Sequence, residues 1–232
     1  MTAQLQREGP VNHKRIRRLM AQLGLQARTR RRWVRTTQSD HELSVFPNRL
    51  RGLRLNAVNQ VWASDFTYIR LGHGFVYLAV ILDLYSRKVV GWALGKNITS
   101  ELAMAALQMA LDNRGPVEGC IHHSDQGMQY ASSNYVEMLK NAGLRPSMSA
   151  RGNPYDNAFV ESFMKTLKVE EVYLQNYRTY QDVIASVPGF IEAVYNAKRL
   201  HSGLGYQSPD EFEAAQNQQR GKAMILSPRC PT

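Results

Sequence analysis

Two aspartates occur at positions where a carboxylate could hold a metal ion. Asp65 interrupts a run of aromatic and β-branched residues, although aspartate is depleted in β-strands. A buried, unpaired carboxylate is costly, and a metal ion is one of the few partners that removes that cost. Asp125 follows a short predicted strand and precedes Gly127, in the kind of loop from which active-site groups often emerge. Each aspartate also has an ordinary alternative, since Asp65 could cap a turn and Asp-x-Gly is common in turns.

Glu161 lies on a predicted helix that has a polar side and an apolar side. The polar side is formed by four residues spaced i, i+4, i+8 and i+11, namely Asn157, Glu161, Lys165 and Lys168. The apolar stripe, which we expect to face the core, consists of Phe159, Val160, Phe163, Met164 and Leu167. The ordinary alternative is a surface pair of Glu161 and Lys165, which would stabilise the helix by only roughly 0.2–0.5 kcal/mol.

The elements that must position these residues follow the order βββαβαβα. The predicted strands are Val61–Ile69, Phe75–Leu82, Lys88–Leu94, Gly119–His122 and Arg145–Ser149. The predicted helices are Ser100–Asp112, Ser133–Asn141 and a long one that starts near Asp156 or Asn157 and includes Glu161. This order favours an α/β fold of the ribonuclease H type, a mixed five-stranded sheet with flanking helices.

The first part of the chain predicts two short helices with a basic surface. The turn signal Gly9-Pro10 separates Thr2–Arg7 from a helix that Gly24 is placed to end. Apolar residues recur at helical spacing in that second helix at Ile16, Leu19, Met20 and Leu23. Its other side carries the candidate DNA contacts Lys14, Arg15, Arg17 and Arg18. Together these features are typical of a short, basic, helix-turn-helix-like segment.

The positive charge of the chain is concentrated at its beginning. The formal net charge is +10, and residues 1–54 hold 13 lysines and arginines against three acids, so the remaining residues sum to zero. A neutral body with a basic arm suits a polyanion, because each phosphate that is neutralised releases condensed counterions. The alternative is a solvated surface or tail. Gln26–Asn59 has no sustained periodicity, so we interpret it as a linker or an arm along DNA.

Other classes of protein are disfavoured by the same sequence. The longest apolar stretch, Phe75–Leu82, is far shorter than the ~20 residues of a membrane-spanning helix. We therefore expect no membrane partner and, because no secretory signal is visible, a cytoplasmic, nucleoid-associated protein. Cys120 and Cys230 lack the spacing of a zinc site or a disulfide framework, so we expect bystander thiols.

Several long motifs carry a family resemblance over nearly the whole chain. They are residues 62–68 (WASDFTY), 83–92 (DLYSRKVVGW), 122–130 (HHSDQGMQY), 147–149 (SMS), 153–163 (NPYDNAFVESF), 195–206 (YNAKRLHSGLGY) and 208–209 (SP). In these segments the chain closely resembles bacterial transposases of the third insertion-sequence family, of the second reading frame type, whose integrase catalytic core belongs to the retroviral integrase superfamily.

The resemblance implies a catalytic triad and a reaction. Its signature of two aspartates, a 35-residue spacer and a glutamate falls on Asp65, Asp125 and Glu161, which would hold Mg²⁺, or Mn²⁺ in its place. Two such ions ~4 Å apart can activate the attacking oxygen and stabilise the leaving one. Water would be the nucleophile for cleavage of DNA and a 3′-hydroxyl the nucleophile for strand transfer. Lys168 is implied to contact the DNA end, and Lys165 and Asn157 on the same side of the helix are further candidate DNA contacts.

The resemblance also implies partners. These are the terminal inverted repeats of the element, the target DNA, a second copy of the chain in a homo-oligomer on DNA, and the product of an upstream reading frame. The helix-turn-helix of the family normally has more chain before the point that corresponds to Met1, so we expect a shortened N-terminal segment.

We therefore expect four regions, with two alternatives to a transposase. The regions are the basic segment (1–45), a linker (46–60), the catalytic core (61–175) and a C-terminal helical extension and tail (176–232) that Pro188-Gly189 should kink or break. The alternatives are a catalytically weak or truncated DNA-binding remnant that regulates transposition, and a plain nuclease. Three histidines could position DNA or water, although a structural role is commoner: His122, His123 and His201.

Overall fold

The computed structural model describes residues 1–25, 45–115, 117–149 and 157–226, with side chains up to residue 219. Its centre is one five-stranded sheet in the order β3-β2-β1-β4-β5. The strands are β1 (Val61–Arg70), β2 (Phe75–Asp83), β3 (Val89–Gly95), β4 (Ile121–Ser124) and β5 (Arg145–Met148). The first three strands pair antiparallel, whereas β4 pairs parallel to both β1 and β5. The expected mixed sheet of ribonuclease H type is confirmed.

The pairing of β1 is unequal on its two sides. Its whole length pairs with β2, from Trp62 opposite Asp83 to Arg70 opposite Phe75. On the other side β4 pairs only with residues 61–63 of β1. The remainder of β1 therefore presents a free edge to this side of the sheet, and Asp65 lies close to the point where that edge begins.

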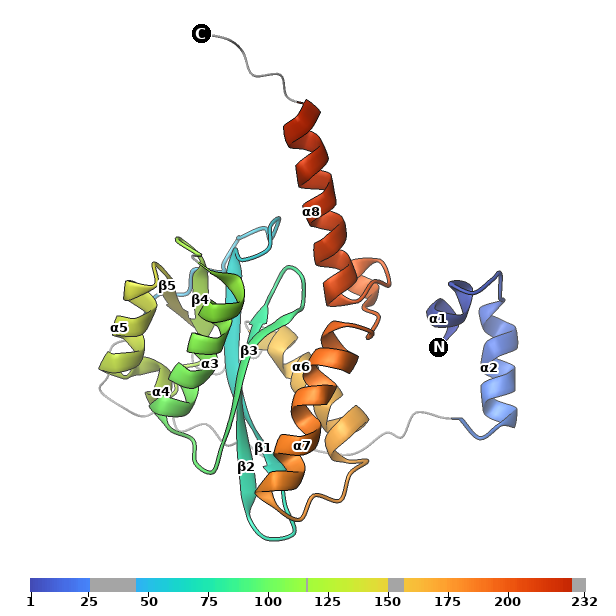
Figure 1. The fold of residues 1–232 in the computed structure, drawn as a ribbon, viewed down its shortest axis with the longest axis horizontal. Coiled ribbons are helices and arrows are strands. Elements are labelled where there is room, and N and C mark those ends of the chain that lie inside the picture. The colour runs from blue at the N-terminus through green and yellow to red at the C-terminus, as the bar shows by residue number, and fades with distance from the viewer. Residues whose placement is uncertain (26–44, 116, 150–156, 227–232) are drawn as a thin grey trace.

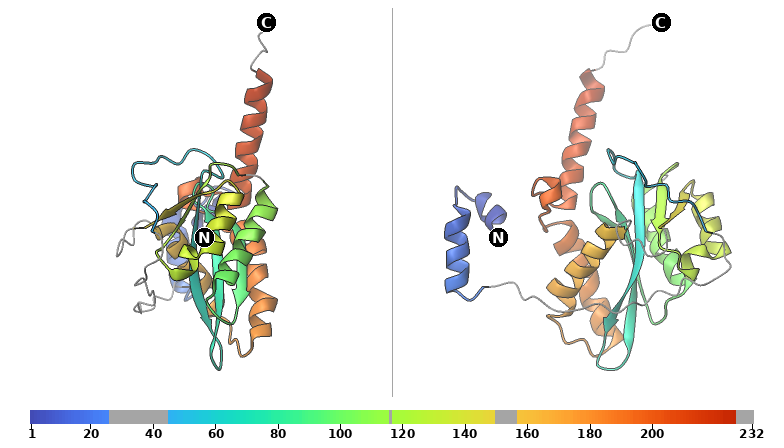
Figure 2. Two further views of the ribbon diagram at one scale, coloured as in Figure 1. Left: turned by 90° about the vertical axis from the view of Figure 1, so that its left-hand side faces the viewer. Right: turned by 180° about the vertical axis from the view of Figure 1, so that it is seen from behind.

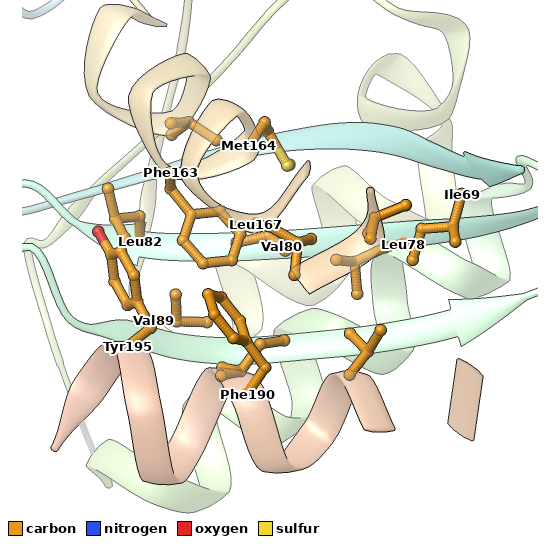
Figure 3. Close-up of a cluster of buried hydrophobic side chains, with 14 of the residues drawn as sticks. Ile69, Leu78, Val80, Leu82, Val89, Phe163, Met164, Leu167, Phe190 and Tyr195 are labelled. Carbon is orange, nitrogen blue, oxygen red and sulfur yellow. The ribbon is translucent and has the colours of Figure 1, made fainter. Parts of the chain in front are cut away.

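Helices cover both faces of the sheet (Figures 1 and 2). On one face lie α3 (Ser100–Arg114), the short α4 (Met128–Ala131) and α5 (Ser133–Asn141). On the other face lie α6 (Ala158–Leu167), which continues as the π-helix η2 (Lys168–Val172), and α7 (Tyr180–Gly189), which continues as the π-helix η3 (Phe190–Asn196). Figure 3 shows the second of the resulting cores, where Phe163 and Leu167 meet Val80 and Tyr195.

Close packing of α3 on the sheet depends on Gly91 in β3. A Cβ atom at this position would lie 2.2 Å from the carbonyl oxygen of Ala106 and 2.8 Å from the Cβ of Ala110. Real Cβ atoms do not approach backbone oxygen that closely, so only glycine allows the helix to lie at this distance from the strand.

Of the kink or break expected at Pro188-Gly189, the break does not occur. The chain stays helical through Pro188, and the hydrogen-bonding pattern changes from α to π at Phe190. A proline removes one N–H from the helical ladder, and a π-helical stretch accommodates such a defect without leaving the helix. Val183, Val187 and Ile191 are completely buried, so packing against the sheet keeps the segment helical on both sides of the proline.

Three further differences concern the elements around the candidate site. The fourth strand is Ile121–Ser124 rather than Gly119–His122, and α4 was not expected. Helix α6 begins at Ala158, close to its predicted start. The expected apolar stripe of this helix is correct except for Phe159, which is 43% exposed. The Phe159 ring lies in the first turn and packs under the Arg87 guanidinium, 3.1 Å from the ring centroid, so it does not enter the core.

The two ends of the described chain meet at one ion pair. Helices α1 (Thr2–Gln6) and α2 (His13–Gln22) form the N-terminal segment, and α8 (Pro209–Leu226) projects from the domain at the other end (Figure 1). Arg7, which directly follows α1, donates to both carboxylate oxygens of Glu211 at 2.9 and 2.7 Å, and to the carbonyl of Tyr206. In the described ranges, no helix combines the length and the apolar character needed to cross a lipid bilayer.

Candidate active site

Asp65 sits on β1 in a position that disfavours its charged form. Its Oδ1 accepts a hydrogen bond from the Phe66 N–H at 2.7 Å. Burial, and after it the charge of Asp125, raises the pKa of Asp65 to about 7. The charge of Glu161 acts in the same direction, while the Phe66 N–H and the Lys168 ammonium oppose the shift. These influences show that the three acids and Lys168 share one electrostatic environment.

The register of the sheet carries Asp125 toward Asp65. Ala63 pairs with His123 in the parallel ladder, and two residues later each strand reaches its aspartate. The loop after β4 then turns sharply, because the Gly127 N–H donates to Asp125 Oδ1 at 2.9 Å. A Cβ atom on Gly127 would lie 2.9 Å from the same oxygen. A glycine at this position therefore leaves room for the carboxylate and helps to orient it.

Helix α6 brings Glu161 to the same part of the sheet. At its start the Asn157 Nδ2 donates to the Ser64 carbonyl at 3.4 Å, next to Asp65 in the chain. Val160 and Met164 flank Glu161 on the helix and are buried against the sheet, which directs the glutamate to the rim of the core. Burial raises the pKa of the Glu161 carboxyl above its usual value.

The three carboxylates are neighbours without forming a closed group. Within residues 1–25, 45–115, 117–149 and 157–226, no set of three acidic, histidine or cysteine side chains is close enough to enclose one ion. What the described residues provide is three carboxylates, of which Asp125 and Glu161 disfavour the negative charge of Asp65. Hard divalent cations such as Mg²⁺ prefer this donor chemistry.

The other predicted DNA contacts on α6 differ in their surroundings. The Lys168 ammonium lies 4.5 Å from the centroid of the Tyr68 ring. Burial lowers the pKa of Lys168, and the charge of Asp65 opposes this effect. Lys165 is exposed to solvent, whereas Asn157 uses its amide nitrogen within the protein. The structure therefore brings Lys168, but not the whole polar side of the helix, into the environment of Asp65.

The basic residues of α2 lie on a separate part of the chain (Figure 1). The Asn12 side chain caps this helix by accepting from the Lys14 N–H at 2.9 Å. Ile16 is buried, whereas the four candidate DNA contacts are exposed: Lys14, Arg15, Arg17 and Arg18. Leu19 and Leu23, which continue the apolar stripe, are 42% and 71% exposed. The helix thus presents a basic surface together with apolar residues that stay accessible.

Sequence reasoning did not single out the aromatic residues that back Asp65 and Asp125. The Tyr130 ring packs on Phe66 with a centroid distance of 5.1 Å and on Tyr135 at 5.5 Å. Burial raises the pKa of Tyr130 well above its usual value, with contributions from the charges of Tyr135, Asp65 and Asp125. Its position five residues after Asp125, within one motif, was the available signal.

The two histidines before Asp125 have structural partners. His122 Nε2 and the Tyr135 hydroxyl are 2.9 Å apart, and burial lowers the pKa of His122 to about 3. A histidine with that pKa is neutral at physiological pH. His123 Nδ1 and Ser147 Oγ are also 2.9 Å apart, which links β4 to β5. Burial likewise lowers the pKa of His201, to about 4, and its ring packs on Tyr195 at 5.2 Å.

The linker before the sheet has one described part. Residues 26–44 lie outside the described ranges, and residues 45–60 run without a helix or strand. The Arg49 N–H donates to Ser147 Oγ at 2.9 Å, and the Arg49 Nε donates to the Pro146 carbonyl at 3.2 Å. This part of the linker therefore contacts β5, an outer strand of the sheet.

Comparisons with known sequences identify the parts of the chain. Residues 56–154 and 142–209 match two models of an integrase core domain, and residues 1–33 match a model of an HTH-like domain. The transposase of insertion sequence IS904 from Lactococcus lactis is 41% identical over 205 residues, or 88% of this chain and 81% of that protein. Transposase InsF of IS3A from Escherichia coli is 41% identical over 92% of this chain and 75% of that protein.

Solved structures with the same fold are viral integrases. A chain of the simian T-cell lymphotropic virus intasome, solved with PP2A regulatory subunit B56 gamma, matches with a TM-score of 0.58 at 19% identity. The match covers 84% of this chain and 63% of the viral one. The catalytic core domain of BIV integrase matches with a TM-score of 0.52 at 20% identity, over 70% of this chain and 98% of that domain. Because the bacterial transposases are 41% identical to this chain over nearly its whole length, this chain belongs to the IS3-type family of insertion-sequence transposases, with an integrase core domain.

Proposed function

We propose that the chain catalyses metal-dependent cleavage of DNA strands and their transfer to new sites, as a polynucleotidyl transferase of an insertion sequence. The observation that carries this proposal is the coupling of Asp65 to two further carboxylates, on the central strand β1 just beyond its pairing with β4. Burial and like charge together make that arrangement costly, and bound divalent cations would remove the cost. Membership of a transposase family supports the same activity.

Asp65, Asp125 and Glu161 would hold the cations. Their donor atoms are all oxygen, which fits Mg²⁺, with Mn²⁺ as a substitute. When bound, two such ions supply activation of the attacking oxygen and neutralisation of the leaving one. The Phe66 and Gly127 N–H groups orient the two aspartates through hydrogen bonds of 2.7 and 2.9 Å. The HTLV-2 integrase catalytic core domain, which matches this chain with a TM-score of 0.50, has been solved in complex with magnesium.

In this proposal other residues bind and orient DNA. Lys168, beside Asp65, contacts a phosphate near the scissile bond, and Lys165 and Asn157 extend that contact along α6. The exposed basic surface of α2 binds the duplex elsewhere through Lys14, Arg15, Arg17 and Arg18. The DNA partners are the terminal inverted repeats and the target. A second copy of the chain, and the product of the upstream reading frame, complete the assembly.

The regions divide the work as follows in this proposal. The basic segment (1–45) and the linker (46–60) bind DNA, and residues 61–175 form the catalytic core. The extension 176–232 supports that core, because Val183, Val187 and Ile191 pack against the sheet beside α6. Without this extension, the face of the sheet that carries Asp65 would lose much of its covering layer.

The experiment that tests the proposal is an assay on a labelled terminal-repeat duplex with Mg²⁺, Mn²⁺ or a chelator. Joined products that appear only with the metals support strand transfer. Duplex that is shifted in a gel but left uncut would instead identify a DNA-binding remnant with a regulatory role. Indiscriminate degradation would identify a nuclease. Either of the last two results overturns the proposal.

A further inference from the structure

An exposed aromatic pair lies at the end of the hairpin formed by β1 and β2. Tyr68 is 37% exposed and Phe75 is 46% exposed, although the β1 residues next to Tyr68, Thr67 and Ile69, are buried. The two rings meet edge to face, with centroids 5.4 Å apart and an interplanar angle of 84°. The pair therefore keeps a fixed geometry while a substantial part of each ring faces solvent.

Cationic side chains accompany this pair. The Lys168 ammonium lies over the Tyr68 ring, 4.5 Å from its centroid. Arg70, also exposed, lies directly opposite Phe75 in the antiparallel register. A ligand that covers the rings would meet positive charge on both sides, so the surface is suited to a ligand that is flat, aromatic and negatively charged. A nucleotide combines these properties in one unit.

The surface and the candidate active site lie on the same strand. Tyr68 follows Asp65 by three residues on β1, about 10 Å further along the strand, and its side chain points to the opposite face of the sheet because side chains alternate. Residues 64–70 of β1 have no pairing with β4, so this stretch borders the open edge of the strand. Lys168 bridges the two places, because its ammonium contacts Tyr68 and its charge also acts on Asp65. A distance of this size corresponds to one or two nucleotides of a DNA strand.

We propose that Tyr68 and Phe75 form a stacking site for an unpaired nucleobase near the DNA end, while Lys168 holds the adjoining phosphate. This inference rests on the proposed function, since it places the base beside the strand that is to be cut. Stacking on a fixed aromatic surface would keep the terminal base pair open, and the phosphate held by Lys168 would lead the strand past the edge of β1 toward the three carboxylates. Such stacking tolerates any base, because every base has a π-face.

The test uses the full chain in a chelator, so that no cleavage occurs. The probe is a 20-base-pair duplex with a four-nucleotide single-stranded overhang that contains one 2-aminopurine, whose fluorescence is quenched when it stacks. The unaltered chain should quench the probe. Tyr68→Leu keeps an apolar side chain but removes the π-face, so quenching should disappear and affinity for the overhang should fall about tenfold. Tyr68→Trp should restore both.

Matched measurements keep the result interpretable. Affinity for the blunt duplex should change less than about twofold in both variants, since phosphate contacts carry that binding. If Tyr68→Leu does not fold, Phe75→Leu serves as the second variant and should reduce quenching. Unchanged quenching in a folded Tyr68→Leu or Phe75→Leu variant would overturn the inference. The inference would also be overturned if the variants lost self-association of the chain while quenching stayed unchanged, because the surface would then be an interface between copies.

The outcome is separable from that of the proposed function. Quenching without metal-dependent cleavage in the duplex assay would leave the stacking site and remove the catalytic proposal. Cleavage without quenching would leave the catalytic proposal and remove the stacking site.

Discussion

Asp65 is buried, and its carboxyl group is influenced by the carboxylates of Asp125 and Glu161 and by the Lys168 ammonium. Burial is the largest influence on its pKa, and the charges of Asp125 and Glu161 add to it. A purely structural aspartate on a strand would normally be paired with a base or replaced by an apolar residue, because an unpaired buried charge is unfavourable. In the proposed function a divalent cation would neutralise these three acids.

The first prediction concerns this residue. Asp65→Asn preserves the shape of the side chain but removes its charge. Strand cleavage and joining should fall by more than about a hundredfold, because a hundredfold is the upper end of the loss when a residue that only supports a metal ligand is replaced. Affinity for the terminal duplex in a chelator should stay within about twofold. Gel shift and product analysis on the same samples measure both. Asp112→Asn on the solvent side of α3 is the control and should leave cleavage unchanged. Joint loss of binding and cleavage in Asp65→Asn would instead indicate a structural role.

At the scale of elements, two kinds of surface are prominent. The helix α2 exposes four basic side chains around the buried Ile16. Helix α3 lies so close to β3 that only hydrogen is tolerated on Gly91. The basic surface of α2 is accessible to a ligand, whereas the contact surface of α3 is packed against the sheet that positions the carboxylates. Substitutions on the two helices should therefore separate binding from stability.

The second prediction tests the basic face of α2. Replacing Arg15 and Arg18 together by alanine should weaken duplex binding and lower the slope of log affinity against log salt by about two, since roughly one counterion is released per phosphate contact. Fluorescence anisotropy at several salt concentrations measures this slope. The control is Gln22→Ala on the same helix, which removes no charge. An unchanged slope in the double variant would exclude this helix from the DNA interface.

The third prediction tests the packing of α3. Gly91→Ala would place a methyl group 2.2 Å from the Ala106 carbonyl oxygen, so helix and strand must separate. We expect a loss of about 1–3 kcal/mol in the free energy of unfolding, as is typical of overpacked cores. Urea denaturation measures it. Gly72→Ala is the matched control, because the nearest atom to its new Cβ is 3.8 Å away, and its stability should stay within about 0.5 kcal/mol. Equal stability of the two variants would contradict the packing argument.

At the scale of the whole molecule, ion pairs connect the base of α8 to the rest of the chain. Arg114 makes a two-point pair with Glu213, at 2.9 and 2.7 Å, with only about a tenth of each side chain exposed. Lys88 reaches Asp210 at 2.7 Å, and Arg7 reaches Glu211. The first pair attaches α8 to α3. The last one attaches the N-terminal segment to α8 and is the more exposed of the two.

The fourth prediction concerns pH and the exposed pair. Hydrogen bonds from Arg7 and from the Ser208 N–H lower the pKa of Glu211 to about 2, from its usual value of 4.5. An acid whose pKa is lowered by folding contributes its stability above the ordinary pKa and loses it as the pH falls toward the lowered one. Attachment of the N-terminal segment should therefore weaken between about pH 4.5 and pH 2.

Hydrogen exchange of the α1 and α2 amides measures that attachment. Because the pair is solvent-exposed, we expect a modest effect, a few-fold loss of protection relative to the intrinsic exchange rate at each pH, and salt should reduce it. Glu211→Gln should exchange at the faster rate at every pH in this range, whereas Glu118→Gln, at an exposed acid elsewhere, should behave like the unaltered chain. Retention of the pH dependence in Glu211→Gln would show that another group is responsible.

The sequence by itself determined the features that depend on neighbouring residues. Apolar runs and alternation predicted all five strands because these patterns are local, and the spacing of Val160, Phe163, Met164 and Leu167 predicted the buried side of α6. Asp65 could be named as a candidate because aspartate is depleted in strands, and the signature that the family resemblance implies added Asp125 and Glu161. The family resemblance, now established by the comparisons, came from motifs that are contiguous in the chain.

Only the tertiary structure decided what depends on residues far apart in sequence. The parallel register of β1 and β4 brings Asp125 toward Asp65, and no local pattern encodes that register. The continuation of the helix through Pro188 is stabilised by packing on the sheet, which overrides the local preference of proline. Phe159 lies outside the core and packs against Arg87, and Lys168 meets Tyr68 across two elements. In each case the deciding interaction is non-local, since side chains compete for burial and charge only after the chain has folded.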